Sequence, residues 1–248
     1  MTRVRIIPVL LLHNGGLYKT VQFKNAAYIG DPVNTVRIFN EKEADELMVL
    51  DYRATKENKP INFSKIEEMA GEAFMPMAYG GGIKSFEEAK KVFDAGYEKI
   101  VLSSILFSKP QLVTEIANVY GAQAVIGCMD IKKNIFGKHK LYTHSGTVNT
   151  GHGPVDWAKN VENMGVGEIM MNSIDLDGSW NGYDELLIEK VSQAVSVPLI
   201  ACGGAGNLQH MKNAVAAGAS AVAAGSMFVY QKKGKGVLIS FPSEIINK

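Results

Sequence analysis

The sequence predicts an α/β protein, a single (β/α)8 TIM barrel that spans residues 1–248 and is built from two (βα)4 half-barrels. Three observations predict this fold. Short apolar runs alternate with longer amphipathic runs from end to end, the length suits one barrel, and the second half of the chain repeats the first. A doubly wound open sheet would also alternate strands and helices, but it gives no reason for a repeat at half the chain length.

The repeat is clearest in two glycine-bearing stretches that begin at Pro76 and Pro198, 122 positions apart. The same spacing pairs Ser104 with Ser226. A small insertion or deletion in the first loop shortens the spacing to 119 for the first strand, which places Leu11 opposite Asp130. The half-barrels are therefore expected at about 1–122 and 123–248.

Eight short apolar runs lack the strict alternation of half-exposed strands. Their brevity and continuous apolar character indicate strands of a parallel sheet that is buried on both faces. The expected strands are Arg5–Leu11, Glu46–Asp51, Met75–Tyr79, Lys99–Ser103, Ala124–Asp130, Glu168–Asn172, Pro198–Cys202 and Ala221–Gly225.

Seven amphipathic runs separate these strands, and an eighth, after the last strand, is weak. Glycines at 96, 121, 165 and 218 stand where helices are expected to end. The expected helices are Val33–Glu43, Phe63–Ala73, Ser85–Ala95, Pro110–Tyr120, Pro154–Met164, Tyr183–Ala194 and Leu208–Ala217.

Composition limits the possible partners and the compartment. With 26 Lys and Arg against 25 Asp and Glu, the chain gives no support for a nucleic-acid or membrane partner. Cys128 and Cys202 lie in apolar runs and are expected to be reduced core thiols. The apolar run Ile6–Leu12 is too short for a membrane span and lacks a cleavage site. We therefore expect a soluble cytoplasmic protein, with no metal and no cofactor.

Two glycine clusters follow symmetry-related strands, and each is followed one βα unit later by a serine. In such barrels these positions lie at the mouth, where glycine lets backbone N–H groups approach an anion. A matched pair of phosphate cradles predicts a ligand with a phosphate at each end, although glycine at such turns can also serve backbone geometry alone. The expected phosphate contacts are Gly81, Gly82, Ser104, Gly203, Gly204, Gly225 and Ser226.

Carboxylates are expected around the same mouth. Asp130 closes the fifth strand, where a side chain can act as a general acid or base. Asp51, Asp175 and Asp177 follow the second and sixth strands. Lys19 lies in the glycine-bearing segment 13–30, as part of a lid over a phosphate or as an exposed loop lysine.

Four charged residues, Arg5, Glu46, Lys99 and Glu168, each begin a strand. They should therefore point into the bottom of the barrel. An unpaired charge there would be costly, so we expect a mutually paired ring that forms a plug or a gate.

Short stretches spread over almost the whole chain carry a resemblance to one known family. They are Arg5–Pro8, Gly30–Pro32, Ala44–Leu47, Gly80–Ile83, Tyr142–His144, Trp157–Lys159, Gly167–Ile169, Ser173–Asp175, Asp177–Gly178, Gly182–Asp184 and Cys202–Gly206. In these stretches the sequence resembles HisF, the cyclase subunit of imidazole glycerol phosphate synthase. The resemblance implies that a glutaminase docks on the bottom of the barrel and that ammonia passes the four-residue gate to a bis-phosphorylated ribulosyl nucleotide. It also implies that Lys19 belongs to a mobile lid and that Asn172 lies in the pocket.

Several positions depart from that family. Its cyclisation uses aspartates on strands one and five, and here the first is Leu11, which can neither donate nor accept a proton. Asn172 and Trp180 indicate an altered pocket, and Lys235–Pro242 replaces the usual final helix. This pattern looks like the paralogues that accompany ATP-dependent amidotransferases of N-acetyl sugars in surface polysaccharide synthesis. Ammonia would then be relayed to a third protein.

Three other interpretations stay open at this point. The chain could be a working cyclase of histidine biosynthesis in which Asp130 suffices or Asp51 substitutes for position 11. It could be the related phosphoribosyl isomerase, although the charged ring and the stretch Tyr142–His144 argue against this. It could also be a non-catalytic scaffold that binds a bisphosphate. Fold alone does not decide among them.

Overall fold

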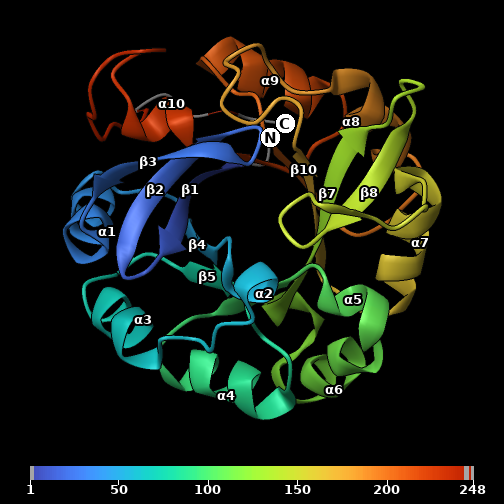
Figure 1. Ribbon diagram of the computed structural model, residues 1–248, viewed down its shortest axis with the longest axis horizontal. Helices are drawn as coiled ribbons and strands as arrows, with labels where there is room; N and C mark the ends of the chain where they lie inside the picture. Colours follow the sequence, from blue (N-terminus) through green and yellow to red (C-terminus); the bar gives the residue numbers. More distant parts are fainter. Residues whose placement is uncertain (1–2, 243–245, 247–248) are drawn as a thin grey trace.

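The computed structural model describes residues 3–242 and 246, which form a closed barrel of parallel strands surrounded by helices (Figure 1). The predicted (β/α)8 barrel is confirmed, because each predicted strand is present and the last strand pairs with the first. The barrel strands, in order around the barrel, are β1 (Arg5–His13), β4 (Leu47–Asp51), β5 (Met77–Gly80), β6 (Lys99–Leu102), β7 (Val125–Lys133), β10 (Glu168–Ser173), β11 (Leu199–Cys202) and β12 (Ala221–Ala224).

The predicted helices are also present, and they end up to three residues earlier than expected. Side-chain caps fix several of their starts: Asp31 accepts a hydrogen bond from the backbone N–H of Asn34, and Ser85 accepts one from the backbone N–H of Glu88. The long helices are α1 (Pro32–Glu41), α3 (Phe63–Ala70), α4 (Phe86–Asp94), α6 (Gln111–Tyr120), α7 (Pro154–Asn163), α8 (Glu185–Ser192) and α9 (Leu208–Ala216). Shorter helical turns are α2 (Ala54–Glu57), α5 (Ile105–Ser108), the 3-10 turn η1 (Ala122–Ala124) and α10 (Ser226–Val229).

Two antiparallel extensions were not predicted. After β1 the chain forms a hairpin of β2 (Gly16–Val21) and β3 (Lys24–Gly30), in the segment expected to be a lid loop. After β7 it forms β8 (His139–Thr143) and β9 (Val148–Asn149). Each half-barrel thus carries a hairpin on its first strand.

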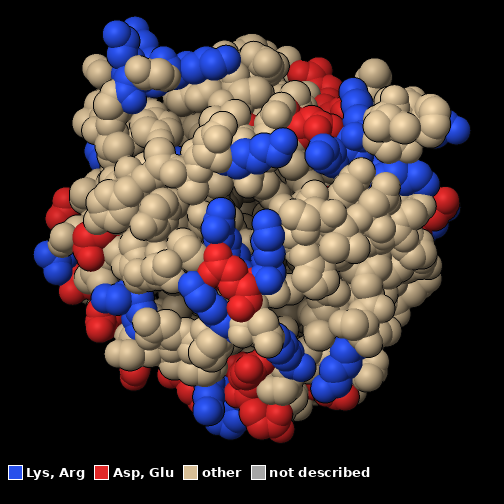
Figure 2. All heavy atoms as spheres, in the orientation of Figure 1, with Lys and Arg blue, Asp and Glu red and all other residues tan. Residues whose placement is uncertain are grey.

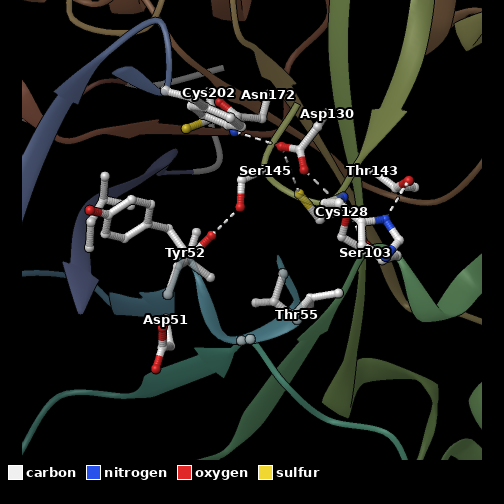
Figure 3. A pocket seen from close by; sticks show the side chains of 18 of the residues that line it. Asp51, Tyr52, Thr55, Ser103, Cys128, Asp130, Thr143, Ser145, Asn172 and Cys202 are labelled. Carbon is white, nitrogen blue, oxygen red and sulfur yellow. Dashed lines mark hydrogen bonds between the residues drawn. The ribbon is translucent and has the colours of Figure 1, made fainter. Parts of the chain in front are cut away.

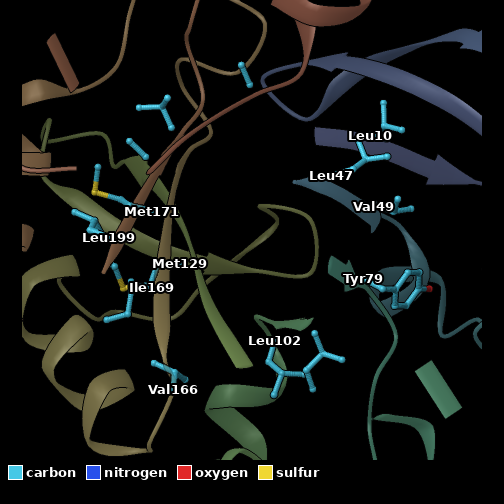
Figure 4. Close-up of a cluster of buried hydrophobic side chains, with 14 of the residues drawn as sticks. Leu10, Leu47, Val49, Tyr79, Leu102, Met129, Val166, Ile169, Met171 and Leu199 are labelled. Atoms are coloured by element: carbon cyan, nitrogen blue, oxygen red, sulfur yellow. The ribbon is translucent and has the colours of Figure 1, made fainter. Parts of the chain in front are cut away.

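The apolar core has two layers, as a barrel requires. Side chains such as Leu10, Val49 and Tyr79 point outward and pack under the helices (Figure 4). Their neighbours Met48 and Met170 point inward and fill the barrel. The period of two along each strand places alternate residues in the two layers. The interior positions therefore decide what the barrel can do.

The strand register repeats between the two halves. Val9 pairs with Met48 in the first half. Cys128, which lies 119 positions after Val9, pairs with Met170, which lies 122 positions after Met48. Residues that the sequence repeat aligns therefore occupy equivalent positions in the two half-barrels.

The structure also bears on the expected absence of a final helix and on the expected absence of a membrane span. Residues 235–242 contain no helix, and Tyr230 forms a bridge with Val237. In the part of the chain that the structure describes, every helix is too short or too polar to cross a membrane.

Candidate active site

A cavity of about 770 Å³ opens at the carboxyl ends of the barrel strands. Asp51, Asp130, Asn172 and Asp177 line it, as predicted from sequence. So do all the expected phosphate contacts: Gly81, Gly82, Ser104, Gly203, Gly204, Gly225 and Ser226. The barrel thus brings together residues that lie as much as 175 positions apart in the sequence.

Asp130 is a half-buried carboxylate of this cavity, and two neighbouring side chains hold it in place (Figure 3). The side-chain amide of Asn172 donates a hydrogen bond of 2.9 Å to Oδ1, and the Ser103 hydroxyl donates one of 3.2 Å to Oδ2. Burial raises the pKa of Asp130 to about 6, the hydrogen bonds from Asn172 and Ser103 oppose that rise, and the charge of Asp177 adds to it. A carboxyl that titrates near neutrality suits general acid or base chemistry.

Sequence reasoning did not single out Ser103 as a contact of Asp130. Ser103 follows β6 directly, and Lys99 and Val101 on that strand also belong to the barrel interior. Alternate residues of a strand face the same side, so the series 99, 101 and 103 could have identified Ser103 as a residue that faces the barrel interior.

The equivalent position in the first half-barrel is apolar. On β7 and β10, Asp130 pairs with Asn172. At the equivalent positions of the first half, on β1 and β4, Leu11 pairs with Leu50. Both leucines line the cavity. One wall of the site therefore carries a hydrogen-bonded carboxylate, and the symmetry-related wall carries two side chains that exchange no proton.

The glycines of the two cradles are required by close backbone packing. Gly81 and Gly203 have φ values of +108° and +91°. A Cβ on Gly81 would lie 2.3 Å from the carbonyl oxygen of Asp51, and one on Gly203 would lie 2.6 Å from that of Ser173. The two contacts are related by the repeat, so the matched glycines have a structural reason whether or not a phosphate binds.

Lys19 lies inside the cavity, so the interpretation as an exposed loop lysine is wrong. Its side chain is 5% exposed, and its Nζ lies 3.4 Å from Oδ1 of Asp177. The Thr20 hydroxyl donates a hydrogen bond of 2.6 Å to the other oxygen of Asp177. A Cβ on Gly225 would approach Nζ of Lys19 to 2.6 Å, so the glycine makes room for the lysine. This arrangement places a cation beside the second cradle.

The other predicted pocket residues have different surroundings. Asp51 accepts hydrogen bonds from the backbone N–H groups of Arg53 and Ala54, and burial raises its pKa. Asp175 does not line the cavity, because it accepts a hydrogen bond of 2.7 Å from the N–H of Lys133 on the rim. Trp180 is likewise absent from the cavity wall, so its expected effect on the pocket is not seen.

Two loops meet across the mouth, which sequence reasoning also missed. The hydroxyl of Ser145 donates a hydrogen bond of 2.5 Å to the carbonyl oxygen of Tyr52 (Figure 3), and the N–H of His144 donates one of 3.3 Å to Ser104. These contacts narrow the entrance beside the first cradle.

The cavity also contains the two thiols. Cys128 and Cys202 are free, buried and part of the cavity wall. Burial raises the pKa of Cys202 to about 12, and it raises that of Cys128 well above its usual value. Both therefore stay protonated at neutral pH and are poor nucleophiles. The described residues contain no group of three His, Cys, Asp or Glu side chains that could hold a metal ion.

The four charged strand-start residues form a closed ring at the opposite end of the barrel. Arg5 bonds to both Glu46 and Glu168, and Nζ of Lys99 lies 3.0 Å from Glu46 and 2.8 Å from Glu168. The side chains of Glu46 and Glu168 are 2% and 9% exposed. Cations and anions alternate around the ring, so each charge has two partners of opposite sign.

Comparison with known proteins adds to this geometry. Residues 5–235 match the protein family described as "Histidine biosynthesis protein". A Pseudomonas aeruginosa relative, provisionally named imidazole glycerol phosphate synthase subunit hisF2, is 46% identical over 249 residues, which cover 100% of this chain and 98% of its own.

Two further relatives agree with it. A Leptospira borgpetersenii protein, provisionally named imidazole glycerol phosphate synthase subunit HisF, is 46% identical over 98% of this chain and 96% of its own. The Exiguobacterium sibiricum protein named imidazole glycerol phosphate synthase subunit HisF is 39% identical over 92% of this chain and 91% of its own.

Proposed function

Because the chain belongs to the histidine biosynthesis protein family and to its HisF group, we propose that it is the ammonia-receiving barrel of a glutamine-dependent amidotransferase, with its own cyclase activity weakened or lost. One observation carries the proposal. Leu11 and Leu50 occupy the register that Asp130 and Asn172 occupy in the other half. A reaction that needs an acid or base group at both of these symmetry-related positions finds one only at Asp130.

The charged ring supports the ammonia-receiving part of the proposal. A lone barrel gains little from four charges held together at its bottom, since hydrophobic residues of similar volume often stabilise a protein as well as a buried ion pair. A glutaminase docked on this face would release ammonia next to the ring. Ammonia would then cross the apolar layer that contains Ile7, Met48 and Ile126 to reach the cavity.

Three partners follow from this proposal, all in the cytoplasm. The glutaminase covers the N-terminal face of the barrel with an interface of at least ~1,200 Å². The two cradles and Lys19 hold a bis-phosphorylated small molecule at the mouth. An ATP-dependent amidotransferase of N-acetyl sugars uses the ammonia that the barrel delivers.

A working cyclase of histidine biosynthesis is the second candidate, and one observation favours it. The pKa of Asp130 is about 6, and its hydrogen bonds to Asn172 and Ser103 hold the carboxylate in place. Such a group is ready for proton transfer near neutral pH. Under this alternative Asp130 acts without a partner or with Asp51.

The test of the proposal is reconstitution with the glutaminase and the sugar amidotransferase encoded nearest to this chain in its own genome. Glutamine labelled with ¹⁵N in its amide is supplied with ATP and the sugar substrate. We expect the barrel to stimulate glutamine hydrolysis and the label to appear in the amidated sugar. Glutamine hydrolysis that is unchanged by the barrel would overturn the proposal.

A further inference from the structure

The hairpin tip, residues 132–140, consists of the end of β7, the start of β8 and the turn between them, and it presents two large apolar side chains to solvent. Ile135 is 93% exposed and Phe136 is 78% exposed. Residues 132–140 also contain four lysines and no acidic residue. The tip extends to the periphery at the upper right of Figure 1, and uncharged atoms protrude there beside Lys and Arg atoms in Figure 2.

The hairpin tip is ordered by its own hydrogen bonds. The side-chain oxygen of Asn134 accepts bonds of 3.0 Å from the N–H groups of Phe136 and Lys138. The base is held from outside, since the N–H of Lys133 donates to Asp175 and Nε2 of His139 lies 2.9 Å from Asp184. The two apolar side chains are thus presented on a fixed turn, which lowers the entropy cost of binding.

The equivalent connection of the first half-barrel is built differently. It joins β1 to β2 through Asn14 and Gly15 alone, because His13 pairs with Gly16, and Nζ of Lys59 donates a 2.9 Å hydrogen bond to Asn14. The short turn of the first half therefore carries no apolar side chain, while the longer connection of the second half exposes two. A small ligand in the cavity gives no reason to expose Ile135 and Phe136.

We propose that the hairpin tip docks the enzyme that consumes the ammonia, through an apolar pocket with an acidic rim on that partner. The inference rests on the proposed function. Aromatic and aliphatic anchors surrounded by charge are typical of protein interfaces. Within the described residues, the side chains of Lys132, Lys133 and Lys138 form no ion pair with an acid, although Nζ of Lys132 lies 5.6 Å from the centre of the Tyr142 ring. No carboxylate of this chain's described part therefore neutralises these three charges.

The position of the tip fits a partner that receives material from the cavity. Ile135 lies five residues along the chain from Asp130, which corresponds to about 16 Å of extended strand. A protein bound there lies at the open end of the barrel, opposite the charged ring. The lysines steer an acidic surface toward this end, and this effect weakens as salt rises.

The experiment measures the affinity of the barrel for the neighbouring sugar amidotransferase, and for the glutaminase separately. In the Ile135→Asp/Phe136→Asp double variant we expect the amidotransferase to bind at least ~30-fold more weakly, as for an interface hot spot, with the glutaminase unaffected. Val119→Asp is the matched control, because Val119 is 64% exposed on α6. It should bind both partners as the native chain does. Lys132→Glu/Lys138→Glu should slow association and reduce its salt dependence.

The outcomes separate this inference from the proposed function. If the native chain binds the amidotransferase and the double variant binds it equally well, the docking surface is wrong and the proposed function stands. If the native chain does not bind the amidotransferase at all, both fall. Two further results would overturn the docking inference. One is a double variant that loses affinity for a ribulosyl nucleotide bisphosphate, which would make the hairpin a lid. The other is native binding to vesicles of phosphatidylglycerol and phosphatidylcholine that the double variant loses.

Discussion

Asn172 donates a hydrogen bond of 2.9 Å to Asp130 across β7 and β10, and the two-fold repeat replaces this polar pair with Leu11 and Leu50 across β1 and β4. The strand register is the same in both halves of the barrel, but only the second half has a carboxylate at this position. Asp130 also accepts one hydrogen bond from Ser103, and the residue equivalent to Ser103 in the repeat is Gly225, which lies beside Lys19. The absence of a carboxylate at position 11 is therefore one of three related differences between the two walls of the cavity. Leu11, Leu50 and Gly225 stand where the other wall has Asp130, Asn172 and Ser103.

The first prediction concerns the pH dependence of stability. Asp130 has a pKa of about 6 when folded, and an unfolded aspartate titrates near about 3.9. The raised pKa means that the folded chain binds this proton more tightly. The stabilising effect is therefore complete below about pH 4 and is lost as the pH rises through 6.

Asp130→Asn should accordingly be more stable than the native chain at pH 7.5, by about 1–3 kcal/mol, and the gain should shrink toward pH 4.5. Urea unfolding at several pH values measures it. Asp94→Asn, which removes a carboxylate that is 56% exposed, is the control. A difference between Asp130→Asn and the native chain that does not change with pH would contradict the account.

The second prediction concerns the charged ring. Lys99→Met leaves Glu46 and Glu168 with Arg5 as their only partner in the ring, so the free energy of unfolding should fall by about 3 kcal/mol. Lys90→Met removes the same charge from an exposed pair with Asp94 and should cost less than about 1 kcal/mol. Denaturant unfolding compares the two, and equal losses would remove the argument that the ring is tightly coupled.

Sequence reasoning identified the fold and much of the cavity, for a physical reason. Apolar runs and helix signals report burial directly, and barrel geometry then places every strand end at one mouth. Asp130 could be assigned because it ends such a run. The ring could be predicted because four charges begin strands, which leaves them only one another as partners.

Other features depended on contacts that no local pattern reports. The β2–β3 hairpin carries Lys19 into the cavity through its bonds to Asp177, a residue 158 positions away. Asp175 turns from the mouth toward Lys133 for the same reason, since its partner lies on a hairpin that was not predicted. Trp180 is bulky, but its loop places it outside the cavity wall.

The third prediction concerns the cradle glycines. Gly81→Ala should lose about 2 kcal/mol more stability than Gly151→Ala. Both residues have positive φ, at +108° and +80°, so both pay the conformational penalty, but only at Gly81 does the added Cβ meet a carbonyl oxygen. The midpoint and slope of denaturant unfolding give the comparison. Equal losses would show that the backbone at Gly81 moves freely.

The fourth prediction concerns anion binding at the mouth. Crystals grown in phosphate or sulfate should hold one anion near Gly82 and Ser104 and another near Gly204 and Ser226. Lys19→Met should weaken the second, because Nζ of Lys19 lies beside Gly225 at that cradle. Both cradles filled only by water at high sulfate would argue against a bis-phosphorylated ligand.

The most direct test of the central claim is ammonia-dependent cyclase activity of the native chain. The protein is given ammonium salt at high pH and the ribulosyl nucleotide bisphosphate, and formation of the imidazole product is followed. Loss of one positioned acid or base costs ~10²–10⁴-fold, so the native chain should turn over very slowly or not at all. Leu11→Asp should then recover part of the rate, since it restores a carboxylate at the position equivalent to Asp130. Robust cyclase activity of the native chain that Asp130→Asn abolishes would contradict the account and assign the protein to histidine biosynthesis.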